Sequence, residues 1–214
     1  MKKRVGLDDI LTEEGFRVSI FGSARIKKRD KEYKEVFELA RMLGEKGIDV
    51  VTGGGPGIMA AGSLGHRKGS IKTKAKSIGL SILLPHEQKT NKGVQYEKKF
   101  ERFSRRLDNF MLLSNAVVVA PGGLGTMLEL FYAWQLAQVE KICDTLIILL
   151  GNHWQGLVKW LEQVPLKKKY FLKKDMNLVF VAKDYKEAIK IIDMAHKAYK
   201  NRDKNFCFNY KKYK

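Results

Sequence analysis

The chain has 214 residues, 44% of them hydrophobic and 30% charged, and a formal net charge of +18. This length fits one α/β domain, since single domains of this class often run to roughly 200–250 residues. No apolar run approaches the roughly 20 residues that cross a bilayer. The N-terminal Met-Lys-Lys-Arg is followed by polar residues, where a signal peptide needs an apolar stretch. We therefore expect a cytoplasmic protein without a membrane segment.

The predicted elements alternate between strand and helix along the whole chain. Residues 1–16 are mainly polar and are interpreted as an N-terminal arm, residues 17–200 as a single domain, and residues 201–214 as a basic tail. Apolar runs predict strands over 17–21, 48–52, 77–84, 116–120, 145–150 and 178–182. Helical spacing predicts helices over 33–47, 58–69, 101–113, 126–140, 154–163 and 185–199, with a polar loop over 85–98. This alternation predicts a doubly wound, Rossmann-like, mostly parallel sheet with helices on both faces.

The positive charge is dispersed rather than confined to one segment. Residues 196–214 hold seven Lys or Arg and one Asp, so +6 lies in this tail and +12 in the other 195 residues. The tail also carries aromatic residues, a composition that can bind single-stranded nucleic acid. A solvated tail is the simpler interpretation, and we favour it because charge alone speaks to association and not to fold or chemistry.

Cysteine and histidine usage points to no metal site. Cys143 and Cys207 have no metal-ligand partner nearby, so neither a disulfide framework nor a zinc site is indicated. His66, His86, His153 and His196 are scattered without metal-ligand spacing and are interpreted as surface or loop residues. We expect no metal and no redox cofactor.

Three predicted strands end in small, flexible residues. These segments are Gly22-Ser23-Ala24, Gly53-Gly54-Gly55 and Pro121-Gly122-Gly123-Leu124-Gly125-Thr126. Glycine allows the backbone to approach a ligand closely, and a helix that starts there favours an anion such as phosphate. One such turn is weak evidence, but three at the carboxyl edge of one sheet are hard to explain structurally. Neither the dinucleotide fingerprint nor the Walker pattern is present, so a phosphorylated small molecule is predicted rather than NAD or ATP in their usual modes.

Two segments together resemble the paired signature of the LOG ("Lonely Guy") family. They are Gly53-Gly54-Gly55-Pro56-Gly57-Ile58-Met59, which fits GGGxxGxM, and residues 121–129, which fit PGGxGTxxE. The resemblance runs from about residue 18 to 192. It implies a Rossmann-like homodimer that splits an AMP-like or cytokinin riboside 5′-monophosphate into free base and ribose 5-phosphate. Family members have also carried the label "lysine decarboxylase", but the sequence shows no recognisable pyridoxal-phosphate site.

The resemblance also implies the residues of the site. The catalytic pair of the family corresponds to Arg106, fifteen positions before Pro121, and to Glu129, the last residue of the second motif. The chemistry is consistent, because a carboxylate can stabilise positive charge on the ribose ring or activate water, and an arginine can hold phosphate or the departing base. The expected substrate and phosphate contacts are Gly22, Ser23, Gly53, Gly54, Gly55, Met59, Arg105, Pro121, Gly122, Gly123, Gly125 and Thr126.

Structural interpretations of these residues stay open. Thr126-x-x-Glu129 also fits a capping box, Arg106 follows Arg105 on a basic helix where side chains are usually solvated, and Ser23 and Arg25 also fit a simple turn. Plant-type members have Glu-Arg-Lys where this chain has residues 105–107, Arg-Arg-Leu, and a glutamate where it has Leu128. The base preference is therefore left open.

Three functional hypotheses remain, in decreasing order of support. The first is the phosphoribohydrolase. The second is a binder or carrier of a phosphorylated ligand without turnover, as in related Rossmann proteins that carry molybdenum cofactor. The third is a nucleic-acid-binding protein that uses the basic surface and tail, for which the sequence offers charge and aromatic residues but no recognised binding module.

Overall fold

Parallel strands form one sheet in the computed structural model, which describes residues 15–83, 89–142 and 145–201. Both cysteines, His86 and all but the first residue of the predicted tail lie outside the described residues. The sheet has the strand order β4-β3-β2-β1-β5-β6-β7, and every neighbouring pair is parallel. Its strands are β1 (Arg17–Phe21), β2 (Asp49–Thr52), β3 (Ser77–Ile82), β4 (Tyr96–Phe100), β5 (Ala116–Val119), β6 (Leu146–Leu150) and β7 (Val179–Ala182).

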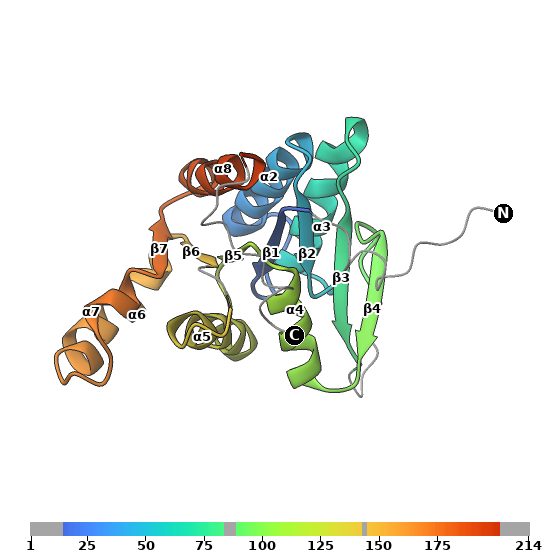
Figure 1. The fold of residues 1–214 in the computed structure, drawn as a ribbon. Helices are drawn as coiled ribbons and strands as arrows, with labels where there is room; N and C mark the ends of the chain where they lie inside the picture. The colour runs from blue at the N-terminus through green and yellow to red at the C-terminus, as the bar shows by residue number, and fades with distance from the viewer. Residues whose placement is uncertain (1–14, 84–88, 143–144, 202–214) are drawn as a thin grey trace.

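Helices cover both faces of this sheet, which confirms the predicted doubly wound architecture. The helices are α2 (Lys31–Glu45), α3 (Ile58–Gly69), α4 (Phe103–Leu113), α5 (Leu124–Gln138), α6 (Gln155–Leu161), α7 (Lys173–Met176) and α8 (Tyr185–Lys200). Helices α2, α3 and α8 lie on one face, and α4 and α5 lie on the other (Figure 1). Short 3-10 segments at Ser70–Lys72 and Asn152–Trp154 and a π-helical turn at Glu162–Leu166 complete the helical structure. None of the helices in the described ranges is long and apolar enough to cross a membrane.

Each face of the sheet buries its own apolar cluster. Alternate side chains of a strand point to opposite faces, so Ile20 of β1 packs with α2, α3 and α8 while its neighbour Phe21 packs with α4 and α5. All four residues of β5 are buried, as expected for a strand in the middle of a sheet that is covered on both sides. Phe16, at the end of the predicted arm, is also buried and contacts the rings of His196 and Tyr199.

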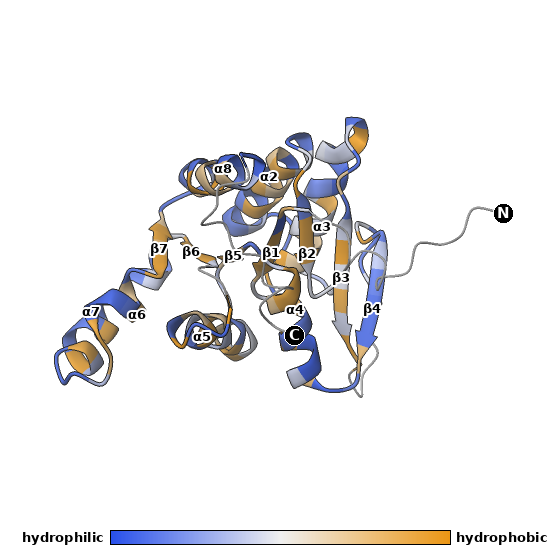
Figure 2. Cartoon of the chain, viewed as in Figure 1, coloured by the Kyte–Doolittle hydropathy of each residue, from blue (hydrophilic) through white to orange (hydrophobic). Residues whose placement is uncertain are grey.

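The predicted polar loop over residues 85–98 is wrong at its end, because residues 96–100 form strand β4. This strand pairs with β3 at the edge of the sheet, with Tyr96 opposite Ile78. Its sequence Tyr-Glu-Lys-Lys-Phe lacks the continuous apolar run by which the other strands were recognised. Charged residues are common on edge strands because they discourage pairing with other chains. The hydrophilic colour of β4 beside the more apolar β3 is visible in Figure 2.

Two histidines differ from the surface interpretation. His66 is fully buried in α3, where Nε2 donates a hydrogen bond to the carbonyl oxygen of Ile48 at 2.9 Å. Burial lowers the pKa of this imidazole to about 4, so the ring is neutral at physiological pH. His196 in α8 is 9% exposed, and its ring is tilted against that of Phe16 with the ring centres 5.1 Å apart. Both histidines have structural positions on helix faces that point to the sheet.

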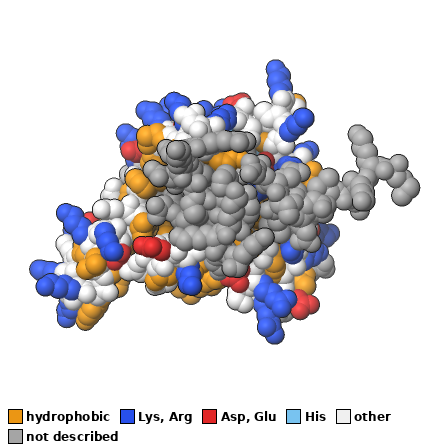
Figure 3. All heavy atoms as spheres, viewed as in Figure 1, with side chains coloured by type: hydrophobic (Ala, Val, Ile, Leu, Met, Phe, Trp, Pro, Cys, Tyr) orange, Lys and Arg blue, Asp and Glu red, His pale blue; other side chains and the backbone are white. Residues whose placement is uncertain are grey.

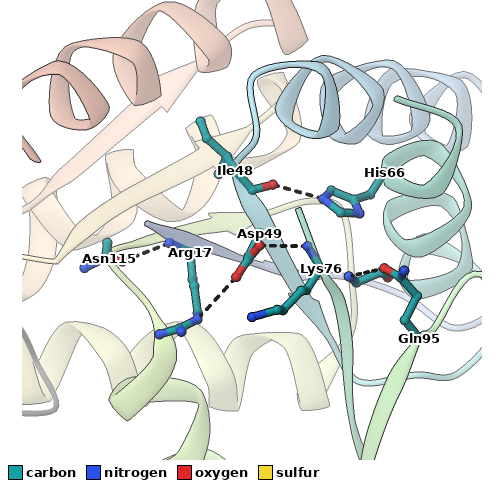
Figure 4. A network of polar contacts seen from close by, with 8 residues as sticks. Arg17, Ile48, Asp49, His66, Lys76, Gln95 and Asn115 are labelled. Atoms are coloured by element: carbon teal, nitrogen blue, oxygen red, sulfur yellow. Dashed lines mark hydrogen bonds and ion pairs between the residues drawn. The ribbon is translucent and has the colours of Figure 1, made fainter. Parts of the chain in front are cut away.

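A polar network closes the amino-terminal edge of the sheet (Figure 4). The guanidinium of Arg17 pairs with the Asp49 carboxylate at 3.6 Å, and both side chains are nearly buried. The backbone N–H of Lys76 donates to the same carboxylate at 2.7 Å, and the backbone N–H of Arg17 donates to Asn115 Oδ1 at 2.8 Å. These bonds tie β1, β2 and the segments that lead into β3 and β5.

The positive charge is spread over the surface. On the face drawn in Figure 3, Lys and Arg side chains form separate groups near α2 and α8, around α7, and beside the start of α4. This distribution agrees with the even charge expected along the sequence.

Candidate functional site

The strand order reverses between β1 and β5, and a cavity opens at the carboxyl ends of these strands. From β1 the chain adds strands outward to β4, then returns to β5 on the other side of β1. Ligands of open α/β sheets bind outside the strand ends at such a reversal. The cavity has a volume of about 660 Å³. It is lined by Ile20, Phe21, Gly22, Ser23, Ala24, Arg25, Gly53, Gly54, Gly55, Met59, Ser81, Ile82, Thr90, Arg106, Gly123, Leu124, Gly125, Thr126 and Glu129.

The three glycine-containing loops meet at this cavity, as predicted from the sequence. Two backbone hydrogen bonds join them, and both involve Ser23. Its N–H donates to the carbonyl oxygen of Pro121 at 2.9 Å, and its carbonyl oxygen accepts from the N–H of Ile58 at 2.9 Å. The loop after β1 therefore links the loop after β5 to the start of α3.

The start of α5 presents unpaired backbone donors. The first hydrogen bond within this helix runs from the Met127 N–H to the Gly123 carbonyl oxygen at 3.0 Å. The N–H groups of Leu124, Gly125 and Thr126 precede it and have no carbonyl four residues back within the helix. All three residues line the cavity. This arrangement favours an anionic group, because the unpaired donors and the helix dipole act together.

The capping-box interpretation of Thr126 and Glu129 is wrong. Helix α5 begins at Leu124, after Gly123 as N-cap, and no side chain caps it. Thr126 lies inside the first turn, and both Thr126 and Glu129 are buried. A Cβ atom at Gly122 would lie 2.1 Å from Thr126 Oγ1, so only glycine at position 122 lets this threonine pack there. The motif therefore builds the cavity wall instead of satisfying the helix end.

Arg106 and Glu129 form a buried ion pair in that wall. Arg106 Nη2 donates to Glu129 Oε1 at 2.5 Å, and each side chain is only 11% exposed. The guanidinium lies 5.7 Å from the ring centre of Phe103 and 5.5 Å from that of Phe110. Its Nε has no hydrogen-bond partner among the described residues. A solvated surface position for Arg106 is therefore wrong.

The position of Glu129 changes its protonation behaviour. Burial raises the pKa of this carboxyl to about 7, against the opposing effect of the Arg106 guanidinium. A carboxyl with a pKa close to the ambient pH can both accept and release a proton, which is the requirement for general acid–base chemistry. Strongly shifted pKa values in a cleft are also typical of functional sites.

The loop over residues 85–98 was a candidate contributor to the base pocket, but no individual residue of the cavity wall opposite α5 was predicted. Ser81 and Ile82 of β3 and Thr90 of the following segment form this wall. Asn91 fixes the segment, because its backbone N–H and its Nδ2 both donate to the Gly54 carbonyl oxygen, at 2.8 and 2.9 Å. These residues belong to no motif, and the contact joins positions 37 residues apart, so the sequence carried no signal for it.

Three predicted contacts lie outside the cavity lining. Arg105 is exposed and lines a neighbouring groove with Lys98, Lys99 and Arg102. Pro121 and Gly122 act behind the lining, through the carbonyl bond to Ser23 and the space left for Thr126. The other predicted site residues line the cavity. In the described part of the chain, no group of three or more His, Cys, Asp or Glu side chains is arranged to hold a metal ion.

The fold and the cavity define a Rossmann-like α/β protein with a ligand site at the reversal of its strand order. Residues 65–192 match the family model described as "possible lysine decarboxylase". This match covers more than half of the chain, which therefore belongs to that LOG-like family. A search of curated proteins found no match at the significance required.

Solved structures with the same fold include proteins of different function. The molybdenum cofactor binding protein of Rippkaea orientalis aligns at 19% identity and a TM-score of 0.63, over 86% of this chain and 98% of that one. The molybdenum cofactor carrier protein of Chlamydomonas reinhardtii aligns at 21% identity and a TM-score of 0.63, over 86% of this chain and 99% of that one. DNA processing protein A of Helicobacter pylori, whose single-stranded DNA binding mode has been described, aligns at 19% identity and a TM-score of 0.54. This alignment covers 86% of this chain and 82% of that one. At these identities the likeness establishes the fold alone.

Proposed function

We propose that the protein is a nucleoside 5′-monophosphate phosphoribohydrolase, which cleaves the N-glycosidic bond of an AMP-like or cytokinin riboside monophosphate. The observation that carries this proposal is the buried Arg106–Glu129 pair in the wall of a cavity lined by three glycine-containing loops. Membership of the LOG-like family supports the same chemistry.

The phosphate is proposed to bind at the start of α5. The unpaired N–H groups of Leu124, Gly125 and Thr126 supply donors there, and Arg25 lines the same cavity with a positive charge. A carboxylate beside a phosphate would repel it. Pairing with Arg106 offsets that repulsion and leaves Glu129 available to the sugar.

In the proposed reaction the bond between C1′ and the base nitrogen breaks while water adds to C1′. Positive charge builds on the ribose ring as the base departs, and the ionised Glu129 stabilises that charge or accepts the proton of the attacking water. The pKa of Glu129 near 7 permits this proton exchange at neutral pH. The products are the free base and ribose 5-phosphate, so the sum of the reaction is the addition of one water.

The direct test incubates the pure protein with AMP, other nucleoside monophosphates and isopentenyl-AMP and measures the released base by chromatography. Release of base from at least one monophosphate, with ribose 5-phosphate as the second product, is expected. Turnover of nucleosides as fast as of their monophosphates would contradict the phosphate site.

The second candidate is a carrier of a phosphorylated ligand, which the fold of the molybdenum cofactor proteins favours. It predicts that a ligand raises the melting temperature according to RT ln(1 + [L]/Kd) but is recovered unchanged. The buried carboxyl with a pKa near 7 favours the hydrolase, because a carrier of an anionic ligand gains nothing from it.

We further propose that the protein is a homodimer through α5. This helix carries apolar residues on its outer side as well as its inner side, with Leu130 and Ala133 in the core and Leu124, Leu128 and Phe131 exposed at 86%, 49% and 40%. A helix of that kind is normally covered on every side. Leu124 also lines the cavity, so a partner at this face would adjoin the ligand site.

Light scattering after size exclusion tests the dimer. Leu128→Lys is expected to shift the mass from dimer to monomer, whereas Met194→Lys, at an exposed apolar residue of α8 (66% exposed), leaves the mass unchanged. A monomeric native protein would contradict the proposal.

A further inference from the structure

The cavity wall opposite α5 contains two hydroxyl groups that share one acceptor. Ser81 Oγ, on β3, donates to Glu97 Oε1 at 2.7 Å. Thr90 Oγ1 donates to the same oxygen of Glu97, which lies on the neighbouring strand β4. Ser81 and Thr90 line the cavity, while Glu97 lies behind them and is not part of the lining.

This arrangement is held by the backbone around it. Asn91, next to Thr90, donates from its side chain to the carbonyl oxygens of Gly54 and Gly55, each at 2.9 Å. Gly54 has φ +74°, and a Cβ atom there would lie 2.6 Å from Ser81 Oγ. The hydroxyl groups are therefore fixed against the second glycine loop.

The direction of these hydrogen bonds determines what the wall can bind. A hydroxyl has one hydrogen and two lone pairs, and a carboxylate accepts hydrogen bonds but donates none. Both hydroxyl hydrogens are used on Glu97, so Ser81 and Thr90 present only lone pairs to the cavity. A ligand group at this wall has to be a donor.

We propose that Ser81, Thr90 and Glu97 form a subsite for the base, and that it selects bases with an exocyclic amino group. This inference rests on the nucleotide function proposed above. Strands β5 and β3 are three positions apart in the sheet, which corresponds to about 14 Å. That separation suits a nucleoside monophosphate with its phosphate at α5 and the far edge of its base at β3.

The test measures dissociation constants by calorimetry in a Glu129→Gln background, so that no ligand is consumed. The ligands are AMP, purine riboside 5′-monophosphate, in which hydrogen replaces the amino group, and IMP, in which a carbonyl oxygen replaces it. AMP is expected to bind about fivefold more tightly than either analogue, since Ser81 and Thr90 are half-buried and a bound analogue covers their lone pairs without offering a donor.

Variants of the wall separate this subsite from general binding. Combined replacement of both hydroxyls, Ser81→Ala with Thr90→Val, is expected to bring AMP and purine riboside 5′-monophosphate to within about twofold of each other. Glu97→Ala removes the shared acceptor, which frees both hydroxyl hydrogens for the ligand and is expected to favour IMP. Glu101→Ala, at an exposed glutamate beyond β4, is the matched control and leaves the ratios unchanged.

The outcomes distinguish the base subsite from the proposed function. Equal affinity for AMP and purine riboside 5′-monophosphate before any change to the wall would overturn the subsite and leave the hydrolase intact. An unchanged AMP-to-IMP ratio in Glu97→Ala would also overturn it. If no nucleotide binds at all, the proposed function fails and the subsite fails with it.

Discussion

The protein holds two nearly buried arginine–carboxylate pairs at opposite edges of the same sheet, and their surroundings differ. At the amino edge, Asp49 accepts from Arg17 and from the backbone N–H of Lys76. At the carboxyl edge, Arg106 is the only hydrogen-bond donor to the Glu129 carboxylate among the described residues, and the pair borders a cavity of about 660 Å³. The same two kinds of side chain thus form a crosslink in one place and part of a cavity wall in the other.

The difference lies in what supports each carboxylate. A backbone N–H donates to the Asp49 carboxylate within the closed end of the sheet (Figure 4). Glu129 has lost its water without gaining such a donor, so its pKa is raised to about 7. A buried ion pair becomes useful for chemistry when its desolvation is only partly compensated.

The largest expected effect is on hydrolysis. Glu129→Gln removes the titrating group but keeps its shape, so the rate of base release is expected to fall by about 10²–10⁴. Asp49→Asn makes the same chemical change at the other pair and should leave the rate within about twofold, because it touches no part of the cavity. Initial rates with saturating nucleotide decide this, and comparable losses in the two variants would remove the distinction between the pairs.

The next effect concerns stability at the amino edge. Asp49→Ala leaves the Arg17 guanidinium buried without its carboxylate, which is expected to cost about 3–5 kcal/mol of the free energy of unfolding. Urea denaturation measures it. A loss no greater than that of Asp193→Ala, which removes a partly exposed ion pair with Lys46, would mean that the amino-edge pair does not stabilise the fold.

The third effect is a pH-dependent gain of stability when Glu129, at the carboxyl edge, is replaced by glutamine. The pKa of Glu129 is about 7 in the folded protein and 4.5 in the unfolded chain. The contribution of the protonated Glu129 carboxyl to the free energy of unfolding is therefore fully present below pH 4.5 and is lost as the pH rises through 7. Glu129→Gln cannot ionise, so at pH 8 it is expected to be more stable than the native chain by up to about 3 kcal/mol, and at pH 4.5 about equal.

Melting temperatures of the native protein and Glu129→Gln between pH 4.5 and 8 test the sign of this stability difference. If the advantage in melting temperature of Glu129→Gln became smaller as the pH rises, a raised pKa of Glu129 would be contradicted. This substitution is thus expected to lower activity and raise stability together.

The smallest effect concerns the glycine behind Thr126. Gly122→Ala places a methyl group against the threonine side chain and is expected to cost about 1–3 kcal/mol. Gly156→Ala, in α6 where an added Cβ meets nothing within 4 Å, should be neutral or stabilise by up to about 1 kcal/mol. Chemical denaturation of both variants is the measurement, and equal stability would show that the loop relaxes freely.

The sequence predicted the centre of the fold better than its edges. Strand β5 was predicted to within one residue of its observed bounds, because a strand covered on both faces is an uninterrupted apolar run. Strand β4 was missed, since its charged residues face solvent at an edge, and the four-residue helix α7 has too few turns to show a period.

The candidate site likewise has a part that local sequence patterns predicted and a part that they did not. The glycine loops were visible as local patterns, and eleven of the fourteen predicted site residues line the cavity. Neighbouring residues on a helix point about 100° apart, so Arg105 and Arg106 face different grooves, and only the helix phase decides which one enters the cavity. The wall of Ser81 and Thr90 depends on long-range pairing and could not be read from one sequence.

The two bonds of Ser23 have a consequence for how such a site can change over time. Both use main-chain atoms, the N–H toward Pro121 and the carbonyl oxygen toward Ile58. Every residue except proline retains both atoms, so replacements around the opening can alter which molecule enters while the spacing of the three loops is preserved. This would let one scaffold acquire new ligands by exchanging side chains alone, without rebuilding its frame.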